Sequence, residues 1–357
     1  MAVRTDRRRR VGLACSDLVR SRYIDAADVG RLEPFADFVY EPFSVGSELM
    51  HQAPRDRAAE GKLAAFAANL DVLVVCHGAP YVSGDLFSRA PALTLVGELE
   101  GDRFGHRIDV AAAHERGVIV VDTSHGSSWP SAEWALGLAL IGRRNAGALF
   151  RRILAGQPTY LPAAERSGPG YEAAELAHKR VGMIGFGHIG RRLAELLRPF
   201  DVEIVVSDPY ASRDLAEPYG VAFGPLERVL DSDVVFVLVP QTSTTVGMLG
   251  RAELELLRPG SVFVNVSRGK VVDTVALLAR LERGDVIACL DVFDPEPMPL
   301  DSPFVDLPNV FLSPHIAGVT EESRRRFFAL MVDECLRHFD GLEPLSALTP
   351  EVVRQRG

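Results

Sequence analysis

The chain has 357 residues, of which 47% are hydrophobic and 24% charged, a composition typical of a globular protein rather than a disordered or fibrous one. Its net charge of -9 argues against general binding to nucleic acid, which requires a basic face. No run approaches the roughly 18 apolar residues of a membrane span, and the apolar segment 11–15 is too short for the core of a signal peptide.

The cysteines indicate neither a metal site nor disulfides. They lie far apart, mostly within apolar runs, and have no metal-ligand spacing. We therefore expect the cysteines to be small buried side chains that bind no metal, in a protein of a reducing, cytoplasmic location. They are Cys15, Cys76, Cys289 and Cys335.

The first third of the chain alternates short apolar runs with helix-like segments, which favours a parallel sheet covered by helices. A long apolar helix follows, with Ser131 as its expected N-cap and Glu133 in its first turn. Residues 155–179 are rich in Gly, Pro and Ala and predict a connection between two domains. The expected strands lie in the runs 11–15, 36–43, 71–80, 92–98 and 117–124.

A second strand and helix series begins at Val181. Its runs are rich in Val, Ile and Phe and apolar on both faces, as in a doubly wound parallel sheet. A final helix, about 321–339, is expected to pack on the N-terminal region. We thus predict a substrate domain of residues 1–145 and 317–357 and a nucleotide-binding domain of residues 146–316. The second series of strands is expected in the runs 180–185, 202–208, 233–240, 261–267, 285–293 and 309–315.

The segment "VGMIGFGHIG" places Gly185, Gly187 and Gly190 directly after an apolar strand and at the start of an amphipathic helix. The first glycine permits a tight turn, the second lets the backbone approach a pyrophosphate, and the third allows the helix to pack on the strand. Asp208 ends the next strand, where a carboxylate accepts hydrogen bonds from a ribose. This arrangement predicts NAD binding and disfavours the 2'-phosphate of NADP.

Three polar residues follow later strands of this series, where ligands bind in such a sheet. They are Arg268, Glu296 and His315. Each alone is typical of a surface residue, but their convergence at one edge of the sheet, beside a bound nicotinamide, favours a functional site. A positioned imidazolium neutralises the charge that hydride transfer leaves on a carbonyl oxygen, and a neighbouring carboxylate fixes the imidazole tautomer.

The segments "NVSRGKVVD", "LDVFDPEP" and "LSPHIAG" closely resemble signatures of the D-isomer-specific 2-hydroxyacid dehydrogenases, over about residues 97–339. The resemblance implies that Arg268 binds and polarises the substrate, that His315 is the acid/base and that Glu296 holds its imidazole. It also implies that Asp291 bonds the nicotinamide carboxamide. The further cofactor contacts implied are His188, Ile189, Val239, Pro240, Thr245, Val266, Ser267 and Gly318.

The chain departs from the family pattern at "EGDRFGHRID", residues 100–109, where members usually have a G-V-G-x-D-N-I-D loop. Two interpretations stay open: either its charged residues shape the substrate mouth, or they are solvated. The turn 77–80 matches a place where family members meet the substrate carboxylate. The expected substrate contacts are His77, Gly78 and Arg103, and the charged residues in question are Glu98, Glu100, Asp102, Arg103, His106 and Arg107.

A second departure is Trp134, which stands where the family has a histidine. We assign Trp129 and Trp134 to packing at domain or subunit contacts.

These observations predict two Rossmann-like α/β domains, a flavodoxin-like substrate domain and an NAD-binding domain. The expected activity is hydride transfer between NAD and a 2-hydroxy or 2-oxo acid by a homodimer. Two alternatives remain: a non-catalytic NADH-sensing module like the co-repressors of this fold, and a dehydrogenase of another small anion such as phosphite. Formate dehydrogenases resemble this group but pair their histidine with glutamine, so Glu296 favours hydroxy-acid chemistry.

Overall fold

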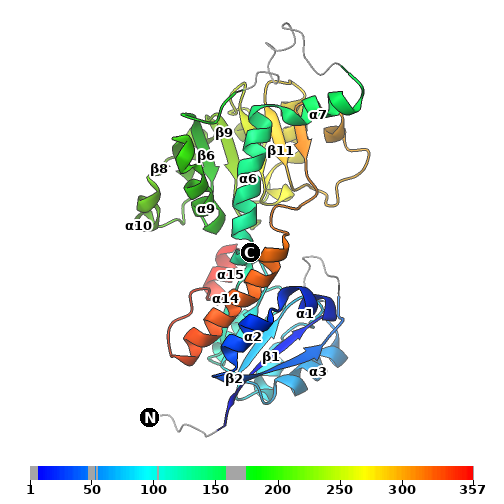
Figure 1. Cartoon of the computed structure of the whole chain (residues 1–357), viewed down its shortest axis with the longest axis vertical. Helices are drawn as coiled ribbons and strands as arrows, with labels where there is room; N and C mark the ends of the chain where they lie inside the picture. The colour runs from blue at the N-terminus through cyan, green and yellow to red at the C-terminus, as the bar shows by residue number, and fades with distance from the viewer. Residues whose placement is uncertain (1–6, 47–52, 54, 103, 158–173, 357) are drawn as a thin grey trace. The chain divides into compact units, whose positions relative to one another are not determined.

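The computed structural model describes residues 7–356, apart from 47–52, 54, 103 and 158–173 (Figure 1). The chain forms two compact units, Met1–Ser127 with Glu321–Gly357, and Ser128–Thr320. The sequence-based division placed the first boundary after residue 145. The structure instead assigns helix α6 (Ser128–Arg143) to the second unit, where it packs on α9 (His188–Leu197), β10 (Val262–Asn265) and β11 (Ile287–Leu290).

The first unit is a five-stranded parallel sheet in the order β2-β1-β3-β4-β5, the flavodoxin-like order that the sequence predicted. Each expected apolar run forms one strand. The strands are β1 (Arg9–Cys15), β2 (Ala36–Pro42), β3 (Val72–Val75), β4 (Leu95–Glu98) and β5 (Ile119–Asp122).

Helices cover both faces of this first sheet. Apolar side chains of α1, α2 and α14 form one buried cluster with the strands, and those of α3, α4 and α5 form another. Helix α14 packs on the N-terminal region, as expected, but it is not the final helix, because α15 follows it. The helices are α1 (Asp17–Tyr23), α2 (Ala26–Leu32), α3 (Arg57–Ala67), α4 (Gly84–Arg89), α5 (Val110–Glu115), α14 (Glu321–Phe339) and α15 (Pro350–Arg356).

The second unit is a seven-stranded parallel sheet in the order β12-β11-β10-β9-β6-β7-β8. The chain order reverses between β6 and β9, which is the switch point of a doubly wound sheet. The sequence missed β8, a two-residue edge strand that is only half-buried. The remaining strands are β6 (Arg180–Ile184), β7 (Glu203–Ser207), β8 (Ala222–Phe223), β9 (Val234–Val237), β10, β11 and β12 (Val310–Leu312).

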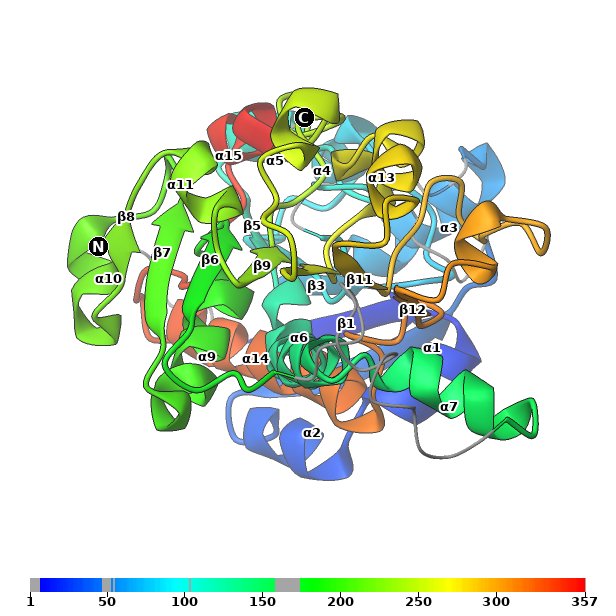
Figure 2. The same cartoon turned by 90° about the horizontal axis from the view of Figure 1, so that it is seen from above.

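The inner strands of this sheet are buried on both faces, which explains their continuous apolar runs. Figure 2 shows α6 and α9 on one face and α11 and α13 on the other, and each pair contributes to a separate buried cluster. The other helices are α7 (Ala146–Leu154), α10 (Arg213–Ala216), α11 (Leu226–Leu230), α12 (Arg251–Leu254) and α13 (Thr274–Leu281).

Helix α6 begins earlier than the sequence predicted. It starts at Ser128, directly after the 3-10 turn Ser124–Ser127, so Ser131 lies inside the helix and is not its N-cap. Pro130 falls in the first turn, where its missing N–H group costs no helical hydrogen bond. Among the described residues, no helix is both long and apolar enough to cross a membrane.

Candidate active site

The carboxyl ends of the inner strands of the second unit lie level. Ile184 pairs with Ser207 and Val237, and Asn265 pairs with both Val237 and Leu290. Leu290 pairs in turn with Leu312 at the end of β12. The segments that follow these strands therefore meet at one edge of the sheet. They carry the predicted residues Gly185, Asp208, Val239, Pro240, Val266, Ser267, Arg268, Asp291 and His315.

The glycine turn after β6 has the backbone geometry of a dinucleotide site. Gly185 has φ +96°, and a Cβ there would lie 2.9 Å from Val239. A Cβ on Gly190 would lie 3.0 Å from the carbonyl oxygen of Gly185, so this glycine lets α9 pack closely. A Cβ on Gly187 would meet no atom within 4 Å, so the protein itself does not require glycine there. The start of α9 is therefore open to a phosphate, with His188 and Ile189 in its first turn.

Asp208 follows β7 and is tied to this turn. Its Oδ2 accepts the N–H of Phe186 at 2.7 Å, and its Oδ1 accepts those of Tyr210 and Ala211 at 2.8 and 3.0 Å. A carboxylate oxygen has two lone pairs, so Oδ2 keeps one for a ribose hydroxyl. The carboxylate thus fits NAD while also holding the glycine turn.

The segments after β9 and β10 are held by their own hydrogen bonds. The hydroxyl of Thr245 donates to the carbonyl of Pro240 at 2.6 Å, which closes that turn. Val266 and Ser267 are buried, and the N–H of Ser267 donates to Asn265 Oδ1 at 3.0 Å. These residues shape the edge of the sheet, and their contact with a cofactor stays a prediction.

His315 and Glu296 form the central pair of the site. The Nδ1 atom of His315 is hydrogen-bonded to Oε1 of Glu296, and both side chains are partly exposed, at 28% and 35%. The backbone of His315 is left-handed, with φ +50°, and its N–H donates to the carbonyl of Asp291 at 2.8 Å. With Nδ1 engaged by the carboxylate, Nε2 is the nitrogen left to exchange a proton with a ligand.

Arg268 lies on a segment that touches the segment of Glu296. A Cβ on Gly269 would lie 1.8 Å from the carbonyl oxygen of Phe293, so the two backbones are in direct contact. Asn265, which is buried, donates to the carbonyl of Arg268 at 3.2 Å. The contacts of Asn265 and Gly269 were not predicted, although both residues stand within the "NVSRGKVVD" segment.

Asp291 is fully buried and holds the segment that carries His315. It accepts the hydroxyl of Ser313 and the N–H groups of Ile316 and Ala317, the last two at 3.1 and 2.9 Å. The carboxylate of Asp291 thus accepts three hydrogen bonds from residues 313–317, the segment that contains His315 and precedes Gly318. The expected bond from Asp291 to the nicotinamide stays a prediction.

The two tryptophans contact groups of their own unit, and the expected subunit contacts stay a prediction. Trp134 of α6 donates from Nε1 to the hydroxyl of Ser313 at 3.0 Å. The guanidinium of Arg192 lies 4.6 Å from the ring of Trp129. Trp134 therefore connects α6 to the segment of His315, a contact that was not predicted.

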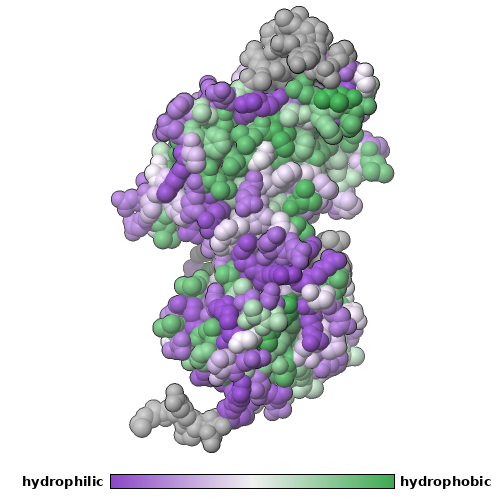
Figure 3. Space-filling model, viewed as in Figure 1, coloured by the Kyte–Doolittle hydropathy of each residue, from purple (hydrophilic) through white to green (hydrophobic). Residues whose placement is uncertain are grey.

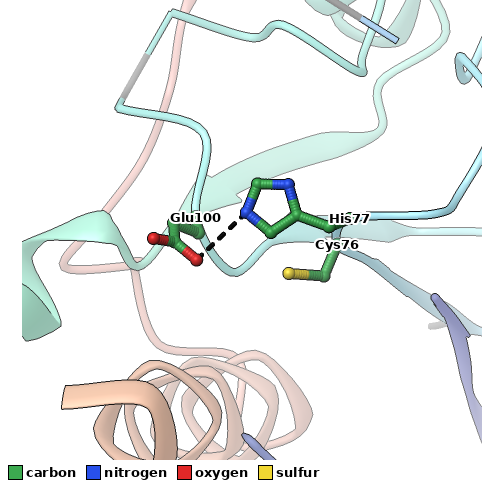
Figure 4. Close-up of side chains that lie close together, drawn as sticks. All are labelled: Cys76, His77 and Glu100. Atoms are coloured by element: carbon green, nitrogen blue, oxygen red, sulfur yellow. Dashed lines mark hydrogen bonds and ion pairs between the residues drawn. The ribbon is translucent and has the colours of Figure 1, made fainter. Parts of the chain in front are cut away.

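In the first unit, a hydrogen-bonded network follows the carboxyl ends of β3 and β4. Arg107 donates from Nη1 to Glu98 Oε1 at 3.0 Å and from Nη2 to His77 Nδ1 at 2.7 Å. Because arginine only donates, Nδ1 of His77 must be the acceptor and Nε2 must carry the proton. His77 therefore donates from Nε2 to Glu100 Oε2 at 3.1 Å, as Figure 4 shows.

This network decides part of the question that the sequence left open about residues 98–109. Glu98 is 0% exposed and Arg107 is 3% exposed, so these two are not solvated residues. Burial raises the pKa of Glu98 to about 7, against the opposing effect of Arg107, and its Oε2 has no hydrogen-bond partner among the described residues. Arg103 lies outside the described residues.

Cys76, His77 and Glu100 bring their ligand atoms within 4.8 Å of one another (Figure 4). The hydrogen bonds argue against a metal there. Since Nε2 of His77 carries a proton, a metal would have to displace it while Arg107 still occupies Nδ1. Burial also raises the pKa of the Cys76 thiol well above its ordinary value, which disfavours the thiolate. We assign no metal site to this cluster.

The turn at Gly78 requires glycine. Its φ is +92°, and a Cβ would lie 2.7 Å from both the carbonyl oxygen of Phe43 and the backbone nitrogen of Ser16. Both ring nitrogens of the neighbouring His77 contact protein groups, and its side chain is 5% exposed. That this turn meets substrate stays a prediction.

Comparison with known proteins agrees with this geometry. Residues 137–317 match the NAD binding domain of the D-isomer specific 2-hydroxyacid dehydrogenases. A glyoxylate reductase of Korarchaeum cryptofilum is 31% identical over 77% of this chain and 82% of its own length. A D-3-phosphoglycerate dehydrogenase of Bacillus subtilis is 32% identical over 78% of this chain, and the match spans only 51% of that longer protein.

The chain thus spans about half the length of its phosphoglycerate dehydrogenase relatives. Among solved structures, a D-mandelate dehydrogenase of Rhodotorula graminis has the same fold, with a TM-score of 0.77, 22% identity, and coverage of 96% of this chain and 97% of that one. Together with the glycine turn and the shared edge of the sheet, these matches show that the chain belongs to the D-isomer specific 2-hydroxyacid dehydrogenase family and that its second unit contains the NAD-binding domain.

Proposed function

We propose that this protein is an NAD-dependent dehydrogenase that interconverts a 2-hydroxy acid and its 2-oxo acid. The observation that carries the proposal is the His315–Glu296 pair, which is accessible to solvent. It follows strands whose carboxyl ends lie level with the glycine turn. A paired imidazole at the same sheet edge as a dinucleotide turn suits the interconversion of an alcohol and a carbonyl.

The chain's own residues have separate roles in this reaction. His315 gives a proton from Nε2 to the substrate oxygen during reduction and removes it during oxidation. Glu296 holds the ring at Nδ1 and stabilises its protonated form. Arg268 binds the substrate carboxylate, for which its planar fork is suited. When bound, NAD supplies or accepts the hydride.

We propose that NAD is held by the glycine turn and by Asp208. The pyrophosphate would lie at the start of α9, where a Cβ on Gly187 has open space around it. The free lone pair of Asp208 Oδ2 would accept a ribose hydroxyl, and the carboxylate would repel a 2'-phosphate. The remaining expected contacts are Val239, Pro240, Thr245, Val266, Ser267, Asp291 and Gly318.

We further propose a homodimer that forms through the second unit. Helix α7 exposes Phe150 at 59%, Ile153 at 53% and Leu154 at 71%, and α6 adds Leu140 at 40%. Figure 3 shows apolar side chains gathered over these two helices. Exposed apolar surface of this kind is typical of a protein interface. The four free, buried cysteines agree with a cytoplasmic location.

The test of the activity uses His315→Asn. Asparagine tolerates the left-handed backbone of this position better than alanine does, so the segment should keep its shape. With NADH and a panel of 2-oxo acids, we expect wild-type protein to consume NADH and the variant to lose about 10² to 10⁴ in kcat. NADH affinity, followed by fluorescence titration, should stay within about threefold, that is, within about 0.7 kcal/mol.

The same experiment separates the alternatives. Tight NADH binding with no turnover of any acid would contradict the proposal and favour the sensing module. Reduction of NAD by phosphite, without turnover of the acids, would favour the small-anion dehydrogenase.

A further inference from the structure

Glu100 is a carboxylate held at the carboxyl edge of the first sheet, beside the turn 77–80. It follows β4, and it contacts His77, which follows β3. Because ligands bind at this edge in open parallel sheets, Glu100 stands where a substrate group would approach the first unit. From this placement we propose that Glu100 selects a 2-oxo acid that carries a small hydrogen-bond donor, a hydroxyl or ammonium group, and rejects a phosphorylated acid. The inference rests on the proposed function.

The carboxylate is fixed in place from one side only. Its Oε2 accepts the hydroxyl of Tyr23 at 2.6 Å and the Nε2 proton of His77 at 3.1 Å. Both donors are buried, with Tyr23 at 8% and His77 at 4% exposure. Glu100 itself keeps 22% of its side chain exposed. One oxygen thus accepts two hydrogen bonds, and among the described residues none donates to Oε1, which can accept a hydrogen bond from a ligand.

The donors around Glu100 are themselves constrained. The tautomer of His77 is set by Arg107, so the ring can donate to Glu100 but cannot turn its lone pair toward it. The buried hydroxyl of Tyr23 has its pKa raised, first by burial and then by the charge of Glu100, so it stays a donor. The site is therefore organised before any substrate arrives, which favours selective recognition.

The local charge opposes a phosphate. Arg107 is the cation of this network, and its guanidinium already donates to Glu98 and His77. The charge of Arg324 lowers the pKa of the Tyr23 hydroxyl, but by less than the charge of Glu100 raises it. Within the described residues, no arginine or lysine forms an ion pair with Glu100. A phosphate would approach this carboxylate as a like charge, whereas a hydroxyl or ammonium group would donate to it.

The size of the effect follows from the type of bond. A hydrogen bond to a charged group contributes about 1.5 to 3 kcal/mol, or about 10- to 150-fold in affinity. Some relatives are named D-3-phosphoglycerate dehydrogenase, and the substrate in that name is a phosphorylated acid. We expect this chain to differ from them in substrate class.

The test compares three 2-oxo acids with the same three-carbon skeleton, each with NADH: hydroxypyruvate, which has a terminal hydroxyl; pyruvate, which has none; and 3-phosphohydroxypyruvate. For wild-type protein we expect kcat/KM to be at least about tenfold higher for hydroxypyruvate than for either of the others. In Glu100→Gln, one amide oxygen can still accept from Tyr23 and His77, while an NH₂ group replaces the free oxygen. We expect kcat/KM for hydroxypyruvate to fall about 10- to 100-fold, that for pyruvate to change less than about threefold, and that for the phosphorylated acid to rise.

Glu115→Gln is the matched control, because it removes one exposed carboxylate of the same unit at the end of α5 and should leave all three values unchanged. Equal or better use of the phosphorylated acid by wild-type protein would overturn the inference, as would an equal change for all three acids in Glu100→Gln. Failure of every acid would remove the proposed function and this inference with it. Turnover of pyruvate without any preference for the hydroxyl would remove this inference alone.

Discussion

The indole of Trp134 and the hydroxyl of Ser313 are hydrogen-bonded at 3.0 Å, which joins a residue of α6 to the segment that carries His315. An indole N–H only donates, so Ser313 must accept it and must give its own proton to Asp291. The carboxylate also accepts from the backbone of Ile316 and Ala317. The left-handed turn at His315 is thus held by hydrogen bonds to Trp134 of α6 and to Asp291.

Trp134→Phe should remove the hydrogen bond to Ser313 while keeping an aromatic ring in the same place. The loss of one partly buried hydrogen bond should lower the free energy of unfolding by about 1 kcal/mol. We expect kcat to fall several-fold because the imidazole is held less firmly, with little change in NADH affinity. Thermal unfolding and steady-state kinetics measure both effects. Trp129→Phe is the control, since it keeps an aromatic ring for Arg192 and should leave kcat unchanged; equal kinetic effects in the two variants would contradict the role of Ser313.

The glycine turn allows folding and cofactor binding to be separated. In Gly187→Ala the new methyl group meets no protein atom within 4 Å, so the thermal midpoint without NADH should match that of wild type. The same methyl would obstruct a pyrophosphate, and we expect NADH affinity to fall at least about tenfold, or about 1.4 kcal/mol. Gly185→Ala is the comparison: with φ +96° and Val239 at 2.9 Å, it should lose stability as well. Unchanged NADH binding in Gly187→Ala would argue against a phosphate at the start of α9.

Asp208→Asn should relax the choice of cofactor. The amide oxygen can still accept from Tyr210 and Ala211, while the NH₂ group replaces the oxygen that accepts from Phe186, so the glycine turn should persist with a cost of about 1 to 3 kcal/mol. Removing the negative charge should raise the ratio of NADPH to NADH affinity by about tenfold or more, because the 2'-phosphate no longer meets a like charge. Fluorescence titration with each cofactor gives this ratio, and a ratio equal to that of wild type would show that the charge does not select NAD.

The buried carboxyl of Glu98 predicts a pH dependence of stability. Its pKa is raised from 4.5 to about 7 by burial, so the folded protein binds this proton more tightly than the unfolded chain does. The contribution of Glu98 to the free energy of unfolding is therefore complete below pH 4.5 and is lost as the pH rises through about 7. We expect the thermal midpoint of wild type to fall over this range, and that of Glu98→Gln, which cannot ionise, to fall less. Parallel curves for the two proteins would contradict this prediction, and Glu115→Gln should follow wild type.

Much of the fold could be predicted because most of its strands lie in apolar runs. All five runs of the first unit and all six of the second became strands, and β3, β4, β9, β10 and β11 are buried along their whole length, which leaves few polar positions. β8 escaped notice because two half-buried residues carry no such signal. The domain boundary after Ser127 was not predicted either. Helix α6 is apolar on most sides, so its sequence pattern does not indicate which of the two sheets it covers.

The predicted residues of the second unit could be found because they stand at strand ends within recognisable segments. What the sequence could not supply was contact across long separations. The bonds from Trp134 to Ser313 and from Arg107 to His77 join residues 179 and 30 positions apart. Such pairs follow from the fold and not from any local pattern, so the contacts of Trp134 with Ser313 and of Glu100 with Tyr23 could not be predicted.

The contact between Gly269 and Phe293 has a consequence for how this enzyme family member can change over time. Because the two main chains touch there, any side chain at residue 269 would push the segment of Arg268 away from the segment of Glu296. A lineage that keeps both segments in place must therefore keep glycine at this position.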